Sequence, residues 1–413
     1  MTQLARRHHL TAAMLVDEEF DLEECRQAMQ AYCREVVLVP NPYGRHGLAK
    51  RLLQLKSLGV AQSFERLRVT VPAFQQTLDR MLRTRRFDVI NLEFPYLGHY
   101  KLRPAPSRER PPALVIDSHE MAYDLPRQFA RAAASPGRRL YGEVDWRKLR
   151  REELRTYRDA DGVYLCSSLD ERRLLDQLPG VRTAVIPNAA DVDFYQPRAD
   201  DPVQDGRTVV YFGLLSTLPN TDAVGHFAQS IWPEVRAAYP EARWKIIGDR
   251  PPLSVQALAG SGIELTGLVP DLRPHLAEAA VVIVPLRLGG GTRLKIVEAM
   301  AMGKAIVSTS LGAEGINAVP GRDILIADDP GDFAAAVLKL LNDPSLRSRL
   351  GASARQLAVE HYSWIAAAAN LEAFFHSLIL SQTADACRSR SLDADPSLRV
   401  STSSYRPAPH ASS

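Results

Sequence analysis

Short apolar runs alternate with helical patterns along most of the chain, most regularly in its second half. Strands are predicted there at Val209–Phe212, Trp244–Ile247, Ile263–Thr266, Val281–Val284, Ile306–Ser308 and Ile324–Ala327. Helices are predicted at Ala223–Trp232, Leu253–Ala259, Leu272–Ala279, Arg293–Met302 and Phe333–Leu341. Strands that alternate with helices predict a parallel sheet wound on both faces, with ligands at the carboxyl ends of its strands.

The first half alternates in the same way but with longer loops. Its predicted strands are Leu10–Val16, Glu35–Val39, Phe87–Leu92, Ala113–Ile116, Val163–Cys166 and Thr183–Ile186. Its predicted helices are Asp21–Cys33, Leu48–Leu58, Pro72–Arg83, a charged helix over Asp145–Asp159, and Leu169–Leu178.

A polar segment with Pro and Gly, Asp200–Gly206, marks a domain boundary. We therefore expect a first domain over 1–203 and a second over 204–363. Two helical stretches, Ser345–Glu360 and Trp364–Ser381, close the folded part, and the helix at 364–381 is expected to pack back on the first domain. Residues 382–413 are rich in Ser, Ala, Arg and Pro without periodicity, which predicts a disordered tail.

The glycine-rich segment between a predicted strand and a predicted helix carries the most chemistry. Gly289 to Gly291 let the backbone turn and approach a ligand closely, Thr292 is expected to cap the helix, and Gly303 to end it. Arg293 and Lys295 stand in the first helical turn, where the helix dipole disfavours cations. An anion bound by free N–H groups would reverse that cost, so the pattern predicts a phosphate site.

Other interpretations of the same residues stay open or fail on spacing. The glycine-rich segment fits neither the Walker pattern nor G-x-G-x-x-G, which excludes an ATPase or a dehydrogenase of those types. Lys295 and Glu298 are three apart and could form a surface ion pair, and Arg293 could form a salt bridge elsewhere. His119 could be a buried histidine at the end of a strand. Asp191 and Asp193 look like a metal-binding Asp-x-Asp, but their place after Pro187-Asn188 favours a turn between domains.

Composition restricts the possible partners and the cellular compartment of the chain. The 51 basic and 48 acidic side chains give a net charge of +3, and no dense basic block suggests nucleic acid. The four cysteines lack zinc-ligand spacing and predict a reduced, cytoplasmic protein. We find neither a signal peptide nor a run near the roughly 20 apolar residues that span a bilayer. A basic stretch with Trp146, Arg147, Lys148, Arg150 and Arg151 could contact anionic lipid headgroups, but Glu152 and Glu153 interrupt it and favour a solvated face.

Several motifs, in order, resemble the retaining nucleotide-sugar glycosyltransferases of family four, and the resemblance covers about Leu4 to Leu380. The motifs are Ile186-Pro187-Asn188 followed by Asp191, Asp193 and Pro197; Phe212-Gly213; Pro219-Asn220-Thr221-Asp222-Ala223; Ile247-Gly248; Gly267-Leu268-Val269; Gly290 to Glu298; Gly312-Ala313-Glu314-Gly315; and Tyr362-Ser363-Trp364. The resemblance implies the GT-B fold, with two Rossmann-like, doubly wound parallel-sheet α/β domains facing a cleft.

The resemblance places the donor nucleotide against the second domain. By position, Glu298 would accept hydrogen bonds from the two ribose hydroxyls, which suits a carboxylate with two oxygens. Arg293 and Lys295 would lie beside the diphosphate. With N–H groups of Gly291 and Thr292, they would stabilise the negative charge that grows as the nucleotide leaves.

Further roles follow by the same carry-over. Gly213 would let a strand–helix turn approach the phosphates, and Leu268 and Val269 would line the base through their backbone. His119, in Asp117-Ser118-His119-Glu120, would lie near the donor sugar. Gly290 stands where family members commonly have a glutamate that contacts that sugar. The stretch Leu214 to Pro219 lacks the Arg and Lys that many members use for the phosphates, so the donor stays open.

The start of the first domain departs from the family pattern. Family members begin with a strand, a Gly-rich loop and a helix before the segment that here reads Leu4 to Leu10. We therefore expect the first domain to lack its first strand and Gly-rich loop. That strand is central in a doubly wound sheet, so the remaining sheet should be split or re-paired.

The expected function is retaining, hexosyltransferase-like transfer from a nucleoside diphosphate sugar, such as a UDP-sugar, to an unknown acceptor. The acceptor would be a polysaccharide, a lipid-linked glycan or another glycoconjugate. No metal, cofactor or nucleic acid is expected. The setting would be cytoplasmic, with possible weak peripheral contact at the inner face of the membrane. A UDP-sugar 2-epimerase of the same architecture and a non-catalytic nucleotide-binding remnant are the alternatives.

Overall fold

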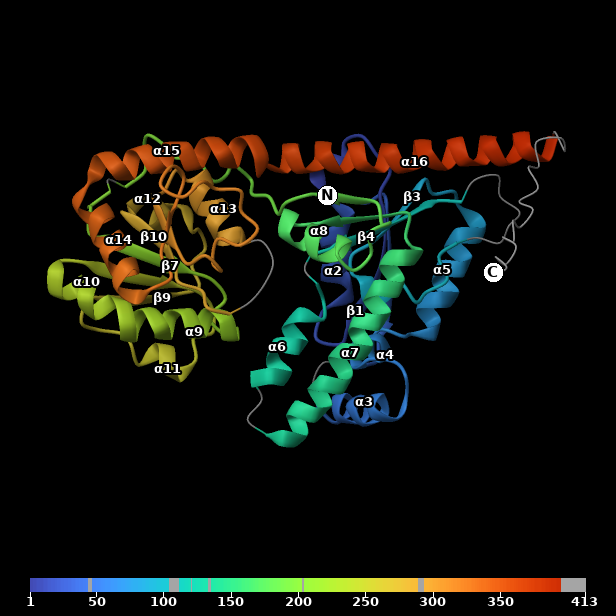
Figure 1. Ribbon diagram of the computed structural model, residues 1–413, viewed down its shortest axis with the longest axis horizontal. Helices are drawn as coiled ribbons and strands as arrows, with labels where there is room; N and C mark the ends of the chain where they lie inside the picture. The colour runs from blue at the N-terminus through green and yellow to red at the C-terminus, as the bar shows by residue number, and fades with distance from the viewer. Residues whose placement is uncertain are drawn as a thin grey trace, which may run out of the picture.

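The chain folds into two α/β domains that lie next to each other along the longest axis of the molecule (Figure 1). The structure is a computed structural model and describes residues 1–43, 47–103, 111–119, 121–132, 135–202, 204–288 and 293–394. Adjacent strands within each named sheet run parallel, so the predicted class, two Rossmann-like parallel-sheet domains, is confirmed.

In the described part of the second domain, six strands form one sheet in the order β12-β11-β10-β7-β8-β9. The strands are β7 (Thr208–Phe212), β8 (Arg243–Ile247), β9 (Ile263–Gly267), β10 (Val281–Val284), β11 (Ile306–Ser308) and β12 (Leu325–Ile326). The helices are α9 (Leu218–His226), α10 (Trp232–Ala238), α11 (Leu253–Gln256), α12 (Arg273–Glu278), α13 (Leu294–Ala301), α14 (Pro330–Asn342) and α15 (Pro344–His361). Every residue of β7 and β10 is buried, as expected for parallel strands covered by helices on both faces.

The helix predicted over Ala223–Trp232 has a more complex form. It starts earlier as α9, passes through a π-helical turn at Phe227–Ile231, and continues as α10. Pro233 explains the break, because proline has no N–H to donate to the preceding turn and its ring disfavours regular α-helix before it.

The described strands of the first domain form two separate sheets, so the expectation of a split sheet is confirmed. One sheet pairs β1 (Thr11–Asp17) with β2 (Glu35–Asn41), and the other has the order β3-β4-β5-β6. The latter strands are β3 (Val89–Leu92), β4 (Ala113–Ser118), β5 (Gly162–Leu165) and β6 (Thr183–Val185). The helices are α1 (Thr2–Ala5), α2 (Leu22–Gln30), α3 (Gly47–Gly59), α4 (Phe64–Arg68), α5 (Pro72–Thr84), a 3-10 turn at Pro95–Leu97, α6 (Asp124–Ala132), α7 (Pro136–Asp159) and α8 (Ser168–Leu175).

Helix α7 starts well before the predicted position at Asp145, so that prediction is wrong. Pro136 occupies the first helical turn, where a missing N–H costs nothing. Gly142 then lets α7 approach α6, because a Cβ at this position would lie 2.7 Å from the Cβ of Ala130. The weak apolar pattern over 136–144 hid this part of the helix.

The last helix, α16 (Trp364–Ala394), runs from the second domain across the first (Figure 1). Phe374 and Leu378 pack against β4 and β5, and Gly162 makes room for them, because a Cβ there would lie 2.7 Å from both side chains. The helix continues to Ala394, so a disordered tail starting at residue 382 is wrong for 382–394. That stretch has neither Gly nor Pro to end a helix. Residues 395–413 lie outside the described residues.

By length and hydropathy, Trp364–Thr383 of α16 is the one candidate membrane span among the described residues, at a mean hydropathy of 1.2. Sequence inspection for continuous apolar runs missed it because polar residues interrupt the stretch. One of them, Glu372, is buried and binds Arg7 at 2.8 Å and His8 at 3.0 Å. One face of the stretch therefore belongs to the interior of the first domain.

Candidate functional site

The candidate site of the second domain is built around the start of α13. Of the predicted site residues, Gly290, Gly291 and Thr292 lie outside the described residues. Arg293 occupies the N-cap position with φ −86° and ψ 99°, so the prediction that Thr292 caps the helix is wrong. Gly303 follows the C-cap with φ +62°, as predicted for the residue that ends a helix.

Lys295 points toward the carboxyl end of β7 rather than into solvent. Its Nζ donates to the Tyr211 hydroxyl at 3.0 Å and to Asn220 Oδ1 at 2.8 Å. A Cβ at Gly213 would lie 2.9 Å from this Nζ, so glycine there admits the lysine as well as leaving the turn open. These contacts argue against the surface ion pair with Glu298 as the main role of Lys295.

The ammonium group of Lys295 lacks a strong counter-charge. Burial, and then the nearby Arg293 guanidinium, lower the pKa of Lys295 to about 7, and Glu298 offsets only part of this. Two cations held together at the N-terminus of a helix form an environment that an anion would stabilise. The structure therefore strengthens the case for an anion site at this end of α13.

Glu298 follows Lys295 on the same helix and is partly buried. Burial raises the pKa of Glu298, while Tyr195 and Lys295 act in the opposite direction. Burial, followed by the Glu298 charge and a hydrogen bond with it, raises the pKa of Tyr195 to about 12. Tyr195 belongs to the connection between the domains, and its position in the Asp191 to Pro197 motif was the only sequence signal for it. The carboxylate has further lone pairs for a ligand.

The two residues predicted to line a base follow the edge strand β9. Leu268 is 76% exposed, whereas Val269 is partly buried against the core of the second domain. Gly267 before them has φ +72°, a conformation that glycine adopts without strain. Leu268 and Val269 therefore follow the carboxyl end of β9, in the same sheet as β7, which Gly213 follows.

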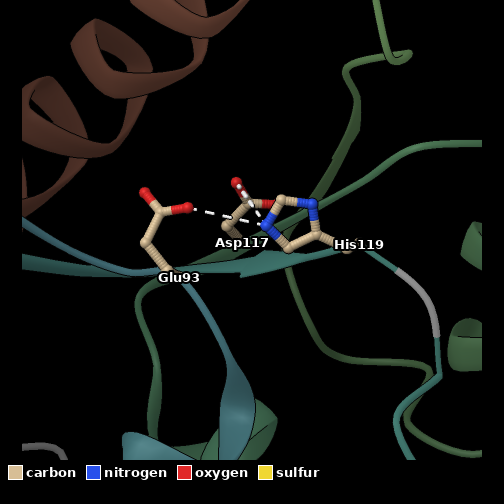
Figure 2. Close-up of side chains that lie close together, drawn as sticks. All are labelled: Glu93, Asp117 and His119. Atoms are coloured by element: carbon tan, nitrogen blue, oxygen red, sulfur yellow. Dashed lines mark ion pairs between the residues drawn. The ribbon is translucent and has the colours of Figure 1, made fainter. Parts of the chain in front are cut away.

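His119 lies in the first domain, just after β4, beside two carboxylates (Figure 2). Its Nε2 is 3.5 Å from Glu93 Oε2 and 3.5 Å from Asp117 Oδ2. Its side chain is 40% exposed, so the buried-histidine interpretation is wrong. Hydrogen bonding to Cys166 and then to Glu93 raises the pKa of His119 to about 10. Burial raises the pKa of Asp117 to about 6, although His119 and the Tyr164 hydroxyl, which donates to it at 2.8 Å, counteract this.

The ligand atoms of Glu93, Asp117 and His119 all lie within 4.8 Å of one another, close enough for a metal ion. A metal would need neutral imidazole, whereas these surroundings favour the protonated ring, so a proton and a metal would compete. At the Asp-x-Asp motif, Asp191 Oδ1 accepts backbone N–H groups of Asp193 at 3.2 Å and Phe194 at 2.9 Å. Asp191 therefore stabilises a turn, in agreement with the turn interpretation.

The loop after His119 is held by Glu153 on α7, which the sequence did not single out. Its carboxylate accepts the backbone N–H groups of Ala122 at 3.0 Å and Tyr123 at 3.3 Å, and the Tyr157 hydroxyl at 2.5 Å. Complete burial raises the pKa of Glu153 to about 8. The predicted solvated face is correct for Arg147, Arg150 and Arg151, which are exposed. It is wrong for Glu152 and Glu153, because both are buried.

An ion pair joins the two domains. Arg173 on α8 lies 3.0 Å from Glu314, which is part of the Gly312 to Gly315 motif in the second domain. The same guanidinium lies 3.2 Å from Asp170 on its own helix. A contact between the domains thus involves one of the motifs that carry the family resemblance.

Comparison with known proteins agrees with this architecture in both domains. A family model described as Glycosyltransferase Family 4 matches residues 22–194, and one described as Glycosyl transferases group 1 matches residues 206–343. The chain belongs to the family 4 glycosyltransferases, with the two family models matching its two domains in order.

Curated relatives match part of the chain. The phosphatidyl-myo-inositol mannosyltransferase of Mycolicibacterium smegmatis is 31% identical over 221 residues, which cover 51% of this chain and 55% of that protein. An MMP alpha-(1->4)-mannosyltransferase of Mycolicibacterium hassiacum is 35% identical over 114 residues, 26% of this chain and 27% of that protein. The chain therefore spans about half, or less, of the length of the curated relatives it matches.

Solved structures share the fold over most of the chain. Sucrose-phosphate synthase from Thermosynechococcus elongatus superimposes with a TM-score of 0.63 at 16% identity, covering 90% of this chain and 100% of that one. Anabaena HepE in complex with UDP gives a TM-score of 0.59 at 16% identity, covering 89% and 100%. At such identities the similarity establishes the GT-B fold alone.

Proposed function

We propose that the chain transfers a glycosyl group from a nucleoside diphosphate sugar to an acceptor, with retention at the anomeric carbon. The observation that carries this proposal is the pairing of Lys295 and Glu298 on α13, beside the carboxyl end of β7. Lys295 is positioned to bind an anion, and the Glu298 carboxylate can accept further hydrogen bonds. A nucleoside diphosphate offers the matching groups, a diphosphate and a ribose diol.

In the proposed reaction, the second domain stabilises the leaving group. Lys295 and Arg293 neutralise charge on the diphosphate as its bond to the sugar breaks, an effect that is largest where the charge develops. Glu298 accepts the ribose hydroxyls and thereby fixes the nucleotide along α13. Gly213, Leu268 and Val269 are proposed to approach the phosphates and the base, as the family resemblance implies.

In the first domain, His119 is proposed to face the donor sugar as a hydrogen-bond donor. Its ring lies between Glu93 and Asp117, and hydrogen bonding to Cys166 and then to Glu93 raises its pKa to about 10, which favours the protonated form. No metal or other cofactor is assigned, because the imidazolium form and the Arg293–Lys295 pair would take over charge stabilisation. Transfer that is undiminished after treatment with EDTA is expected, whereas loss of transfer that Mn²⁺ or Zn²⁺ restores would contradict this point.

A UDP-sugar is the proposed donor class. Support comes from Anabaena HepE, whose structures hold UDP, UDP and glucose, or UDP-glucose. The M. smegmatis relative named as a phosphatidyl-myo-inositol mannosyltransferase makes a lipid-linked acceptor one candidate beside polysaccharide.

A cytoplasmic location is also proposed. This location agrees with Cys25, Cys33 and Cys166 of the described residues, which form no disulfide, and cell fractionation tests it.

The central experiment incubates the purified chain with a panel of UDP- and GDP-sugars and measures binding, donor hydrolysis and transfer. Glu298→Ala is expected to weaken nucleotide binding, and Arg293→Ala is expected mainly to slow turnover. Glu234→Ala and Arg349→Ala, at exposed positions on α10 and α15, are the matched controls and should change neither. If no nucleotide shifts the thermal unfolding and no donor is hydrolysed or transferred, the proposal fails.

Two other functions give different outcomes in the same experiment. A UDP-sugar 2-epimerase would convert the donor without an acceptor, which product analysis reveals. A non-catalytic binder would bind nucleotide, with loss of binding in Glu298→Ala, but would turn over no donor with any acceptor. No structural observation favours either over transfer.

A further inference from the structure

Helix α3 lies at the end of the first domain opposite α16 (Figure 1) and exposes a leucine face. The face is formed by Leu48, Leu52, Leu55 and Leu58, which are 72%, 57%, 66% and 53% exposed. At about 100° per residue these four positions fall within one arc of the helix. Singly exposed leucines are ordinary, but an arc of them on one helix indicates an interaction surface.

The opposite side of α3 holds the helix against α7. Leu53 and Ser57 are buried, and the Ser57 hydroxyl lies 3.1 Å from that of Tyr141. Lys148 donates to the carbonyl oxygen of Val60 at 2.7 Å, just beyond the end of α3. The leucine face is thus presented by a fixed helix, and Lys148, one of the basic residues considered above for lipid contact, has a structural role instead.

The charges around the leucine face are all positive on its own helix. Residues 47–59 contain Lys50, Arg51 and Lys56 and no acidic residue. Arg51 and Lys56 are exposed, and at about 100° per residue they fall within the leucine arc or at its edge. Cations that flank an exposed apolar arc are the composition of helices that lie in the plane of an anionic lipid surface.

The start of α7, next to α3, also exposes cationic and apolar side chains. Arg138, Arg139 and Leu140 are exposed there, and Leu140 is 69% exposed. Nearby carboxylates are already engaged, since Asp145 accepts the backbone N–H of Phe64 at 2.8 Å and Glu143 is paired with Arg147. An anionic partner therefore meets little opposing charge at this end of the domain.

We propose that the α3 leucine face docks the first domain on an anionic phospholipid bilayer. The leucines enter the boundary between headgroups and acyl chains, while Arg51 and Lys56 contact lipid phosphates. A flat lipid surface fits the arrangement, because one straight helix supplies both the apolar arc and its flanking cations. The proposal is independent of which sugar is transferred, and it needs no catalysis to be tested.

The test is sedimentation of the full chain with vesicles of phosphatidylcholine, with or without phosphatidylglycerol. Stronger binding to the phosphatidylglycerol vesicles is expected, and it should weaken as salt screens the charges. Leu52→Gln/Leu55→Gln should weaken binding at least about tenfold on the anionic vesicles. Arg51→Gln/Lys56→Gln should weaken binding about 30-fold on the anionic vesicles and leave any binding to the neutral ones unchanged.

The matched control is Leu253→Gln/Leu380→Gln, which removes two leucines that are 81% and 69% exposed on other elements. It should bind vesicles like the unaltered chain. Thermal unfolding and UDP binding serve as folding readouts and should be unchanged in all three variants, because the substituted residues are exposed.

Three outcomes would overturn the proposal. The first is no preference of the unaltered chain for anionic vesicles. The second is equal loss of binding in the control variant. The third is a vesicle-free dimer, measured by light scattering, that Leu52→Gln/Leu55→Gln dissociates, because a second copy of the chain would then cover the leucine face.

Discussion

Both domains are built from parallel strands covered by helices, but they differ in whether the described strands form one sheet or two. In the second domain β7 and β10 are buried at every position, inside one continuous sheet. In the first domain β1 and β3 have one buried residue each, Val16 and Leu92, and these strands belong to different sheets. Strand β4, in contrast, is wholly buried, and α16 covers it. Parallel strands need cover on both faces, and in the first domain part of that cover comes from the far end of the chain.

The largest expected effect is in the second-domain core. Trp244 is fully buried, with its ring centroid 4.6 Å from that of Phe227. Trp244→Ala should lower the free energy of unfolding by about 3–5 kcal/mol, through lost burial and a residual cavity. Chemical denaturation followed by circular dichroism measures this. Leu253→Ala, at an exposed position, should change it by less than about 0.5 kcal/mol. A loss below about 1 kcal/mol for Trp244→Ala would mean that this core is less tightly packed than its burial indicates.

The second-largest expected effect tests whether the two domains unfold independently. Leu378 on α16 is 1% exposed, whereas Leu380 is 69% exposed. Leu378→Ala should cost about 2–4 kcal/mol, and Leu380→Ala should cost little. Hydrogen exchange should accelerate in β4 and β5 of the Leu378 variant but not in β7 and β10. Equal acceleration in both sheets would show that the domains unfold as one unit.

This contrast also explains what sequence reasoning could predict. Continuous apolar runs such as Val281–Val284 reveal buried parallel strands directly, so the strands of the second domain were largely correct. The beginning of α7 was missed because its helix contacts depend on a glycine rather than on an apolar stripe. The approach of Lys295 to Tyr211 could not be foreseen, because it joins residues from different strand–helix units. The role of Glu153 was hidden for a related reason, since a buried acid between charged neighbours has the same pattern as a solvated one.

At the candidate site, the pH dependence of nucleotide binding tests the environment of Lys295. The pKa of Lys295 is lowered to about 7, so the folded protein without ligand loses this charge as the pH rises through 7. A bound diphosphate favours the charged form, so binding must take up a proton above that pH. UDP affinity should therefore fall by up to about tenfold per pH unit between about pH 7 and 9.

Calorimetry in buffers of different ionisation enthalpy measures both the affinity and the proton uptake. Lys295→Arg keeps its charge throughout this range and should flatten the profile, and Lys295→Met should bind weakly with an equally flat profile. The same shift affects stability. The pKa of Lys295 is lowered from 10.5 in the folded state, so below pH 10.5 the unfolded chain binds a proton that the folded protein does not. The free energy of unfolding should therefore be highest above pH 10.5 and fall as the pH is lowered toward 7. An unaltered chain with a flat binding profile would contradict the assigned environment.

The smallest expected effect is at the contact between the domains. Arg173 is 41% exposed in its pair with Glu314. A double-mutant cycle with Arg173→Met and Glu314→Gln should give a coupling of about 0–1 kcal/mol in the free energy of unfolding, because solvent screens the pair. A coupling well above 1 kcal/mol would mean that the domains are held together more firmly than this contact suggests.

The two passages of the chain between the domains lie side by side. The N–H of Ala190 donates to the carbonyl oxygen of Tyr362 at 2.8 Å, and the N–H of Trp364 donates to that of Ala190 at 3.3 Å. Because the two connections are hydrogen-bonded to each other at one place, a rotation of one domain about this place would leave these two bonds intact. Tyr195 lies five residues from Ala190 and contacts Glu298. A ribose bound at Glu298 would therefore lie close to the place where the two connections meet, so nucleotide binding and the relative orientation of the domains would be coupled through Tyr195.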